Sequence, residues 1–364
     1  MFQRWQWSVP ANLLVAGEYA ITSPGGVGVA VAVEPRATAT VFLADRSARP
    51  GPHLAQQPGE IVAHSGGGTE RIYPDAGHHL AEAVIAHAVG PSHTSPVSAD
   101  TPSPQWRIEI DTTTFFDARS GAKQGLGSSA AAAVLLTTAL FQLGDRDPVF
   151  LKEDVASTAI AAHRAANGGR GSGYDIVTST LGGVVRFVGG AHPQWQPSGC
   201  ARQWTGHALR LFSWFSGTSV ASSHAVSRFN QYVPEGSPER TAFIARNNAV
   251  VDRIEGATTW DALFEAVSDS RRLGEEIGAA VGVPATIDIC QPHRDDGWVV
   301  KASGAGNERA VILAQPNPRR SVPRQASVLP VSTEGLRWEY GSGEAGHGVA
   351  GPGVAGPGGA GPAP

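Results

Sequence analysis

The sequence predicts an α+β protein folded into two lobes, and three observations lead to this class. A chain of 364 residues that is 41% apolar and 16% charged can bury a sizeable core, and its length suits two lobes better than one. Strand-like alternation of apolar and small residues fills the first part of the chain, whereas two long helical patterns occupy residues 238–254 and 259–281. We therefore expect an N-terminal lobe over residues 1–200 and a C-terminal lobe over residues 201–335.

The N-terminal lobe opens with a predicted pair of strands, because apolar and small residues alternate on both sides of a Ser23-Pro24-Gly25-Gly26 turn. A helix predicted over residues 154–167 ends at Gly168-Gly169, as helices often do. Spacing in the rest of the lobe predicts strands over residues 41–43, 60–63, 71–73, 106–110 and 183–188, and helices over residues 79–89 and 128–143.

The C-terminal lobe combines its two long helices with three further strands. These strands are expected over residues 208–215, 298–302 and 310–314. Residues 336–364 are predicted to be a disordered tail without a catalytic part. From residue 341 onward this tail is nearly all Gly, Ala, Pro and Val, a composition that cannot build a core and lacks the strict period of collagen.

Composition excludes several classes of function. A net charge of −4 and a pI near 6.3 argue against a nucleic-acid surface, which needs a basic excess. No apolar run approaches the length of a membrane span. Cys200 and Cys290 lie far apart and without CxxC spacing, so they indicate neither a disulfide framework nor a zinc site. We therefore expect a cytoplasmic protein.

The most informative segment is Lys123-Gln124-Gly125-Leu126-Gly127-Ser128-Ser129-Ala130, which runs directly into a predicted apolar helix. Two glycines allow close approach of the backbone to an anion, two hydroxyls can ligate a metal or a phosphate oxygen, and the helix directs its positive end at the same point. The segment is neither a Walker motif nor a dinucleotide GxGxxG motif. It predicts a phosphate cradle, with an ordinary helix cap as the alternative.

Two more glycine turns accompany this cradle. One is Gly171-Ser172-Gly173-Tyr174-Asp175, and the other is Ser303-Gly304-Ala305-Gly306. The chain has only three lysines, and two of them lie close to a glycine turn: Lys123 is two residues before Gly125, and Lys301 is two residues before Ser303. This placement favours a role as phosphate partners. The alternative is chance in an arginine-biased sequence. For Asp175 the alternative to an active-site role is a dipole-stabilising residue at a helix start.

Taken together, these motifs resemble those of the GHMP small-molecule kinases, over residues 8–315 and in the same order. The first motif appears as Pro10-Ala11-Asn12-Leu13-Leu14-Val15-Ala16-Gly17-Glu18-Tyr19-Ala20, the second as residues 125–130, and the third as residues 301–309. The resemblance implies a ribosomal S5 domain 2-like N-terminal lobe that binds the nucleotide and a ferredoxin-like C-terminal lobe. Within the superfamily, His163-x-x-Ala166-Asn167-Gly168 followed by residues 171–175 is most similar to the phosphomevalonate kinases.

The resemblance also implies roles for individual residues, with ATP and Mg²⁺ as cofactors. It makes Asp175 and Lys123 catalytic and Ser129 a metal ligand. The nucleotide would lie on Gly125, Leu126, Gly127, Ser128, Ser129 and Ala130. The acceptor would lie against Asn12, Glu18, His163, Ser172, Ser222, Ser303, Gly304, Ala305 and Gly306.

Two departures from the family pattern bear on the activity. Asn12 replaces the lysine of the first motif and removes a cation, and Asn307-Glu308-Arg309 replaces the usual Gly-Gly-Asp of the third. The leading interpretation is ATP-dependent phosphorylation of phosphomevalonate to diphosphomevalonate for isoprenoid synthesis. The alternatives are a kinase for mevalonate or another small hydroxylated metabolite, and a catalytically impaired nucleotide- or metabolite-binding protein. Partners are expected to be small molecules rather than nucleic acid or membrane, and a homodimer is left open.

Overall fold

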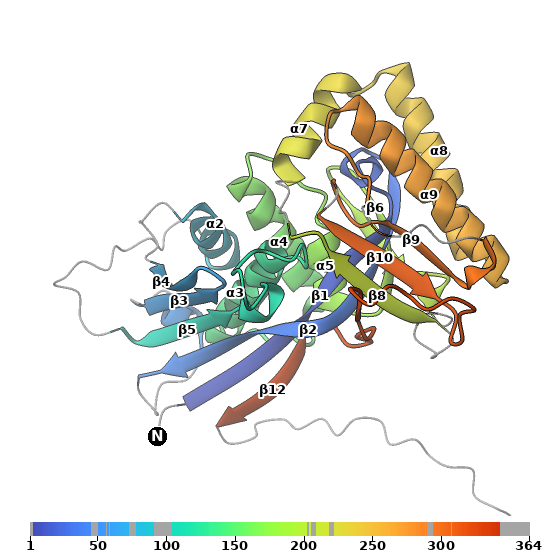
Figure 1. Ribbon diagram of the computed structural model, residues 1–364. Coiled ribbons are helices and arrows are strands. Elements are labelled where there is room, and N and C mark those ends of the chain that lie inside the picture. The colour runs from blue at the N-terminus through green and yellow to red at the C-terminus, as the bar shows by residue number, and fades with distance from the viewer. Residues whose placement is uncertain are drawn as a thin grey trace, which may run out of the picture.

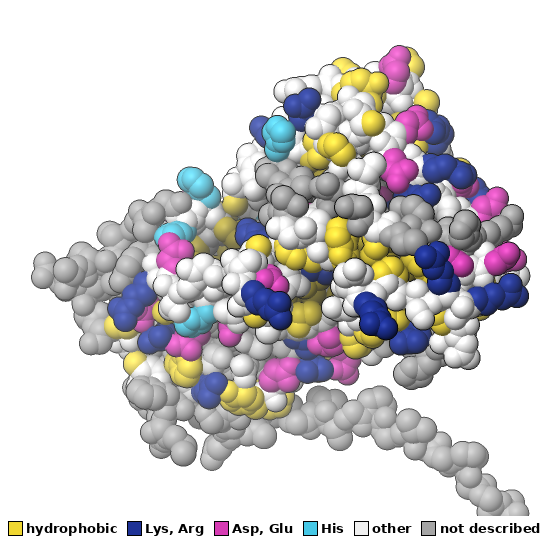
Figure 2. All heavy atoms as spheres, in the orientation of Figure 1, with side chains coloured by type: hydrophobic (Ala, Val, Ile, Leu, Met, Phe, Trp, Pro, Cys, Tyr) yellow, Lys and Arg dark blue, Asp and Glu magenta, His cyan; other side chains and the backbone are white. Residues whose placement is uncertain are grey.

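The predicted α+β class is confirmed by two sheets, each covered by helices, in a computed structural model (Figure 1). It describes residues 3–44, 50–55, 57, 59–72, 78–90, 104–201, 204, 209–217, 222–287, 289, 294–306 and 308–342. Within these residues no helix is long and apolar enough to cross a membrane. On the face of the molecule drawn in Figure 2, Lys and Arg side chains are interspersed with Asp and Glu and do not form one continuous basic patch.

The first sheet has the strand order β12-β1-β2-β5-β3-β4, and β6 and β7 extend it beside β2. Its pairs are antiparallel except β3 with β5, which run parallel. The strands are β1 (Gln3–Ala16), β2 (Val27–Leu43), β3 (Gly59–Ser65), β4 (Gly68–Ile72), β5 (Trp106–Asp111), β6 (Val184–Val188), β7 (Gln194–Pro197) and β12 (Arg337–Ser342).

Helices of the N-terminal lobe pack on one face of this sheet, and α3 (Ser128–Leu143) lies at the centre of the packing. Its alanine- and leucine-rich surface is buried almost all round, as expected for a helix that is apolar on every side. It contacts β1, β2 and β5 as well as the neighbouring helices. The other helices of the lobe are α1 (Pro52–Ala55), α2 (His79–Ala88), α4 (Lys152–Ala166) and α5 (Tyr174–Leu181), with short 3₁₀ turns at Ala20–Thr22 and Thr113–Phe115. Burial of α3 therefore fixes the position of its first residue.

The second sheet, in the order β11-β8-β10-β9, belongs to the C-terminal lobe. Two long helices of this lobe begin at capping hydroxyls: Ser237 accepts from the amide of Arg240 at 3.2 Å, and Thr259 accepts from the amide of Ala262 at 3.2 Å. The elements are β8 (Arg210–Phe215), α7 (Ser222–Tyr232), α8 (Pro238–Glu255), α9 (Trp260–Ala280), a 3₁₀ turn at Arg294–Asp296, β9 (Trp298–Ala302), β10 (Arg309–Ala314) and β11 (Ser327–Val328).

Contacts between the lobes centre on the turn after β1. Tyr19 packs on Phe229 of α7, with ring centroids 5.2 Å apart. Asn247 of α8 donates to the carbonyl of Val27 at 2.7 Å, and Asn248 accepts from the Val27 amide at 2.9 Å. The two lobes are thus joined where the first motif ends.

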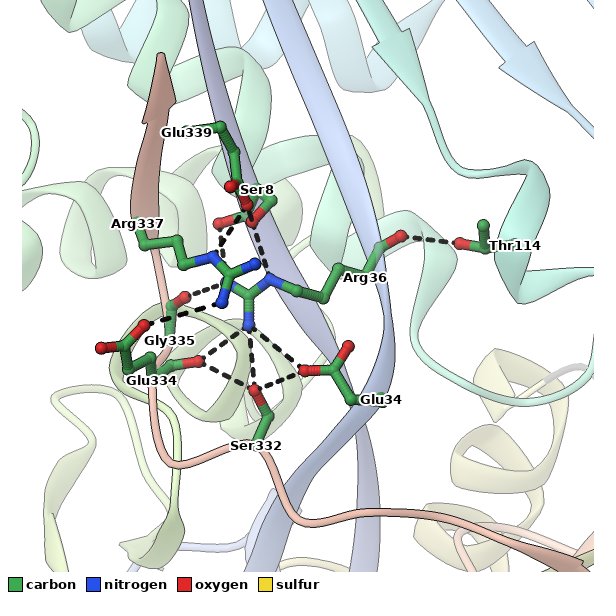
Figure 3. A network of polar contacts seen from close by, with 9 residues as sticks. All are labelled: Ser8, Glu34, Arg36, Thr114, Ser332, Glu334, Gly335, Arg337 and Glu339. Carbon is green, nitrogen blue, oxygen red and sulfur yellow. Dashed lines mark hydrogen bonds and ion pairs between the residues drawn. The ribbon is translucent and has the colours of Figure 1, made fainter.

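The C-terminal end of the described chain returns to the first sheet, since β12 pairs with β1. This strand lies inside the range that composition assigns to the tail, and Figure 3 shows the reason. Arg36 of β2 donates to the hydroxyls of Ser8 at 2.7 Å and Ser332 at 2.9 Å, and to the carbonyl of Glu334 at 3.0 Å. Burial lowers the pKa of Arg36, and the surrounding oxygens compensate for its desolvation. One buried guanidinium therefore ties the returning chain to β1 and β2.

Replacing Arg36 is expected to destabilise the fold. Arg36→Ala removes a buried cation and leaves several buried oxygens without a donor, so we expect a loss of about 3 kcal/mol in the free energy of unfolding. Urea unfolding measures it. The control is Arg71→Ala, since the Arg71 side chain is 64% exposed and pairs with Glu60 at 3.3 Å; that change should cost roughly 1 kcal/mol or less. Equal effects would contradict the role given to Arg36.

Candidate active site

The predicted cradle is a left-handed turn that only glycine adopts readily. Gly125 has φ of 65° and Gly127 has φ of 83°. A Cβ atom on Gly127 would lie 2.4 Å from the amide nitrogen of Asn12, so this position has no space for a side chain. The turn is therefore fixed both by its backbone and by what packs beneath it.

The amides at the start of α3 follow directly after this turn. Gly127 is the N-cap residue and provides no side-chain cap, and the first helical hydrogen bond is made by the Ala131 amide at 2.9 Å. Within the described residues the amides of Ser128, Ser129 and Ala130 have no hydrogen-bond partner. A buried helix with free amides at its positive end is suited to binding an anion.

Asn12 joins this cradle to the second glycine turn. Its backbone amide donates to the Leu126 carbonyl at 3.3 Å, and its side-chain amide donates to the carbonyl of Asp175 at 3.3 Å and to the hydroxyl of Ser179 at 3.0 Å. Asn12 is only 2% exposed. The starts of α3 and α5 thus converge on one residue of β1, which brings Asp175 beside the cradle. At this point the chain carries a neutral amide in place of a cation.

Three carboxylates from separate segments of the chain act on the phenol of Tyr174. Burial raises the pKa of this phenol, and the negative charges of Asp175, Glu18 and Glu308 raise it further. Glu18 comes from the first motif and Glu308 from the third, so three carboxylates from distant segments act on one hydroxyl group.

His163 of α4 stands over the cradle. Its Nε2 lies 3.1 Å from the Ser129 hydroxyl, and the side-chain amide of Asn167 lies 3.5 Å from its Nδ1. That amide also donates to the His163 carbonyl at 2.7 Å, which fixes its nitrogen toward the ring. His163 and Ser129 are therefore hydrogen-bonded to each other, and Asn167 lies at the other ring nitrogen of His163.

The two lysines with similar spacing have different surroundings. Lys123 is exposed, with no side-chain hydrogen bond among the described residues. Lys301 is 1% exposed, forms an ion pair with Glu18 across the lobe boundary, and donates to the Ala302 carbonyl at 2.5 Å. Only Lys123 can meet a ligand at the surface, and the carboxylate of Glu18 is engaged by Lys301.

Arg164 contributes to the site, although the sequence did not predict this role. Its guanidinium donates to the carbonyls of Gly171 at 2.9 Å and Ser172 at 2.8 Å, and it also reaches Gly190 and Ala191. Burial lowers its pKa. Arg164 thereby fixes the turn before Asp175, and the Ser172 hydroxyl accepts from the Tyr174 amide at 3.5 Å. The sequence signal for this role is the position of Arg164, seven residues before the glycine turn that begins at Gly171.

The third motif reaches the cradle through the residues after its turn. Gly304 and Gly306 have φ of 78° and 92°, and Ala305 packs in the cluster that contains Tyr19. A Cβ atom on Gly125 would lie 3.0 Å from the Glu308 carboxyl carbon, so the Glu308 side chain lies against the cradle. Asn307 lies outside the described residues, and so does the side chain of Ser222 at the start of α7.

Comparisons with known proteins match the segment that contains these residues. Residues 105–183, which hold the cradle, His163 and Asp175, match the family described as GHMP kinases N terminal domain. Over 344 residues the chain is 26% identical to the phosphomevalonate kinase of Streptomyces sp. (strain CL190), covering 82% of this chain and 86% of that protein. Residues 105–183 are thus a GHMP kinase N-terminal domain, and most of the chain is similar to a phosphomevalonate kinase. The predicted family and the predicted class of enzyme, a small-molecule kinase, are thereby confirmed.

Solved structures share the GHMP kinase fold over nearly the whole chain. The Lin0012 protein of Listeria innocua is 21% identical, with a TM-score of 0.68 over 92% of this chain and 99% of that one. The phosphomevalonate kinase of Streptococcus pneumoniae, in complex with phosphomevalonate and AMPPNP, is 17% identical, with a TM-score of 0.62 over 85% of this chain and 92% of that one. The two-lobed GHMP kinase architecture is therefore present.

Proposed function

We propose that this kinase transfers the γ-phosphoryl group of ATP to phosphomevalonate and releases diphosphomevalonate. The observation that carries the proposal is the junction at Asn12, which holds the anion-binding turn at residues 125–130 and the backbone of Asp175 against each other. Phosphoryl transfer depends mainly on positioning of the reactants and on stabilisation of charge. The junction would position the two segments, and the free amides at the start of α3 would stabilise negative charge. The Streptomyces relative supports the choice of acceptor.

The nucleotide would place its polyphosphate on the free amides of Ser128, Ser129 and Ala130. A pocket of about 360 Å³ lies farther along the same helix, lined by Ala132 and Leu136 of α3 together with residues of β3, α2 and β5, among them Ile61 and His79. Its size and largely apolar lining suit an aromatic base. We assign the base of the nucleotide to this pocket.

A bulky residue at position 132 should block the base. Ala132→Trp fills the pocket from α3, and since Ala132 is half-buried the fold should tolerate it. We expect KM for ATP to rise about tenfold or more while KM for the acceptor stays within about twofold, because about 1–3 kcal/mol of apolar contact is lost. Initial-rate kinetics with each substrate varied in turn tests this. A parallel rise in both constants would contradict the assignment.

The donors present fit a nucleotide-bound Mg²⁺. Among the described residues no group of three or more His, Cys, Asp and Glu could hold a metal by itself. Mg²⁺ that accompanies a nucleotide needs only one or two protein oxygens, because phosphates and waters supply the rest. The Ser129 hydroxyl, held by His163, and the Asp175 carboxylate would contribute those oxygens. The ion would neutralise charge on the transferring group.

The neutral Asn12 favours an acceptor that is already an anion. A phosphate monoester has its second pKa near about 6 and is largely ionised at neutral pH, so it needs neither a base nor a neighbouring cation to become nucleophilic. An alcohol needs both. Asp175 would then orient the acceptor and the metal rather than remove a proton, while Lys123 would meet charge at the surface of the site.

A panel of acceptors tests the proposal. ADP release is measured with ATP and phosphomevalonate, with ATP and mevalonate, and with ATP alone. We expect release only with phosphomevalonate. Turnover with mevalonate alone would replace the proposal with a kinase for a hydroxyl acceptor, and nucleotide binding without turnover on either acceptor would show an impaired, ligand-binding member of the superfamily.

A further inference from the structure

Arg309 is a buried cation at the boundary between the lobes. It is the first residue of β10, three positions after Gly306 of the third glycine turn, and it is 4% exposed. In the family pattern an aspartate occupies this position. A buried arginine there needs groups that can accept its hydrogen bonds, and two of the three acceptor oxygens belong to a residue of the opposite lobe.

The partners of Arg309 include the residue that enters the cradle. Its guanidinium donates to the backbone carbonyl of Gln124 and, at 2.9 Å, to the side-chain oxygen of the same residue. Gln124 directly precedes Gly125. On the C-terminal side, Arg309 donates to the Ser213 hydroxyl and lies over the Phe215 ring, 5.5 Å from its centroid. Both latter residues belong to β8, so the guanidinium is held in one lobe and binds two oxygens of a single residue in the other.

The charge state of Arg309 is compatible with this arrangement. Burial lowers its pKa to about 10, and the negative charge of Glu308 opposes that change. The group therefore stays protonated at neutral pH. An aspartate could not donate to the Gln124 carbonyl, and a lysine could not place two donors in the plane that the two oxygens of Gln124 require.

We propose that Arg309 is a positioning residue that sets the nucleotide-binding shape of the cradle from the opposite lobe. It fixes Gln124, which fixes the path of the chain into Gly125 and thereby the direction of the amides after it. The proposal rests on the proposed function only in taking a nucleotide as the ligand of the cradle.

The test compares two buried arginines. Arg309→Lys keeps the charge and loses the fork. Its matched control is Arg240→Lys. Arg240 is also buried, at 5% exposure, and its guanidinium lies 4.7 Å from the centroid of the Phe229 ring. It bridges the lobes through hydrogen bonds of 2.9 Å to Ser23, Val233 and Asn230, but it does not contact the cradle. For both variants, the melting temperature and the Kd of ATP without acceptor are measured by calorimetry.

We expect both substitutions to lower the melting temperature and only Arg309→Lys to weaken ATP binding, by about tenfold or more, as expected for charge-assisted hydrogen bonds lost at a site. Should Arg309→Lys fail to fold, Gln124→Leu removes one of the two contacts from the cradle side and should weaken ATP binding about threefold. Wild-type affinity in Arg309→Lys, or in Gln124→Leu where the first variant is unfolded, would overturn the proposal. A wild-type chain that binds no ATP would instead overturn the proposed function together with its nucleotide site, and no change in Arg309 could then be seen.

Discussion

Asp175→Asn is expected to lower kcat by about 10²-fold to 10³-fold and to weaken the binding of ATP far less. The substitution keeps the size of the side chain and its helix, and it removes the negative charge in the first turn of α5. Loss of one preorganised electrostatic group in an active site typically has an effect of this size. Single-turnover kinetics with saturating phosphomevalonate, together with calorimetry of ATP binding, separates the two quantities.

The control for Asp175→Asn is another aspartate in the first turn of a helix. Asp154 lies in the first turn of α4, is 57% exposed at its side chain, and faces Arg146 at 3.6 Å. A purely helix-stabilising role would make Asp154→Asn and Asp175→Asn alike, with a modest loss of stability and unchanged kcat. That pattern would refute the role given to Asp175.

Gly127→Ala should abolish tight nucleotide binding, with Kd for ATP rising about 100-fold. The added methyl group has to adopt φ of 83° and meets the Asn12 amide nitrogen at 2.4 Å, so the turn or Asn12 must move. Left-handed backbone alone costs an alanine roughly 1–2 kcal/mol, and displacement of Asn12 adds to this. Equilibrium ATP binding and urea unfolding measure the two effects.

Gly236→Ala separates backbone strain from the collision. Gly236 has φ of 80°, and nothing lies within 4 Å of the Cβ it would carry. This variant should lose stability by the strain alone and bind ATP normally. If Gly127→Ala also bound ATP normally, the turn would not be the phosphate site.

Local signals account for the part of the fold that proved predictable. The helix expected over residues 128–143 is present as Ser128–Leu143, because the glycine turn before it and the apolar run within it are both read from adjacent residues. The helix expected over residues 259–281 is present as Trp260–Ala280, with Thr259 as its cap. Capping and apolar spacing depend only on neighbouring residues.

Contacts between distant segments account for what could not be predicted. β12 has a short, mixed sequence beside a glycine-rich tail, and it becomes a strand because β1, at the other end of the chain, offers it an edge. Lys123 and Lys301 have comparable local surroundings, yet burial beside Glu18 separates their roles. Arg309 was visible only as a departure from a motif, since its partner Gln124 lies in the other lobe.

The return of residues 337–342 to β1 has a consequence for how the chain is made. When the first half of the protein has been synthesised, the outer strand of its sheet, β12, has not yet been translated. The edge of β1 therefore stays unpaired until the whole second lobe has been synthesised. Expression of the first lobe by itself should therefore yield aggregates, and adding residues 332–342 in trans as a peptide should improve its recovery.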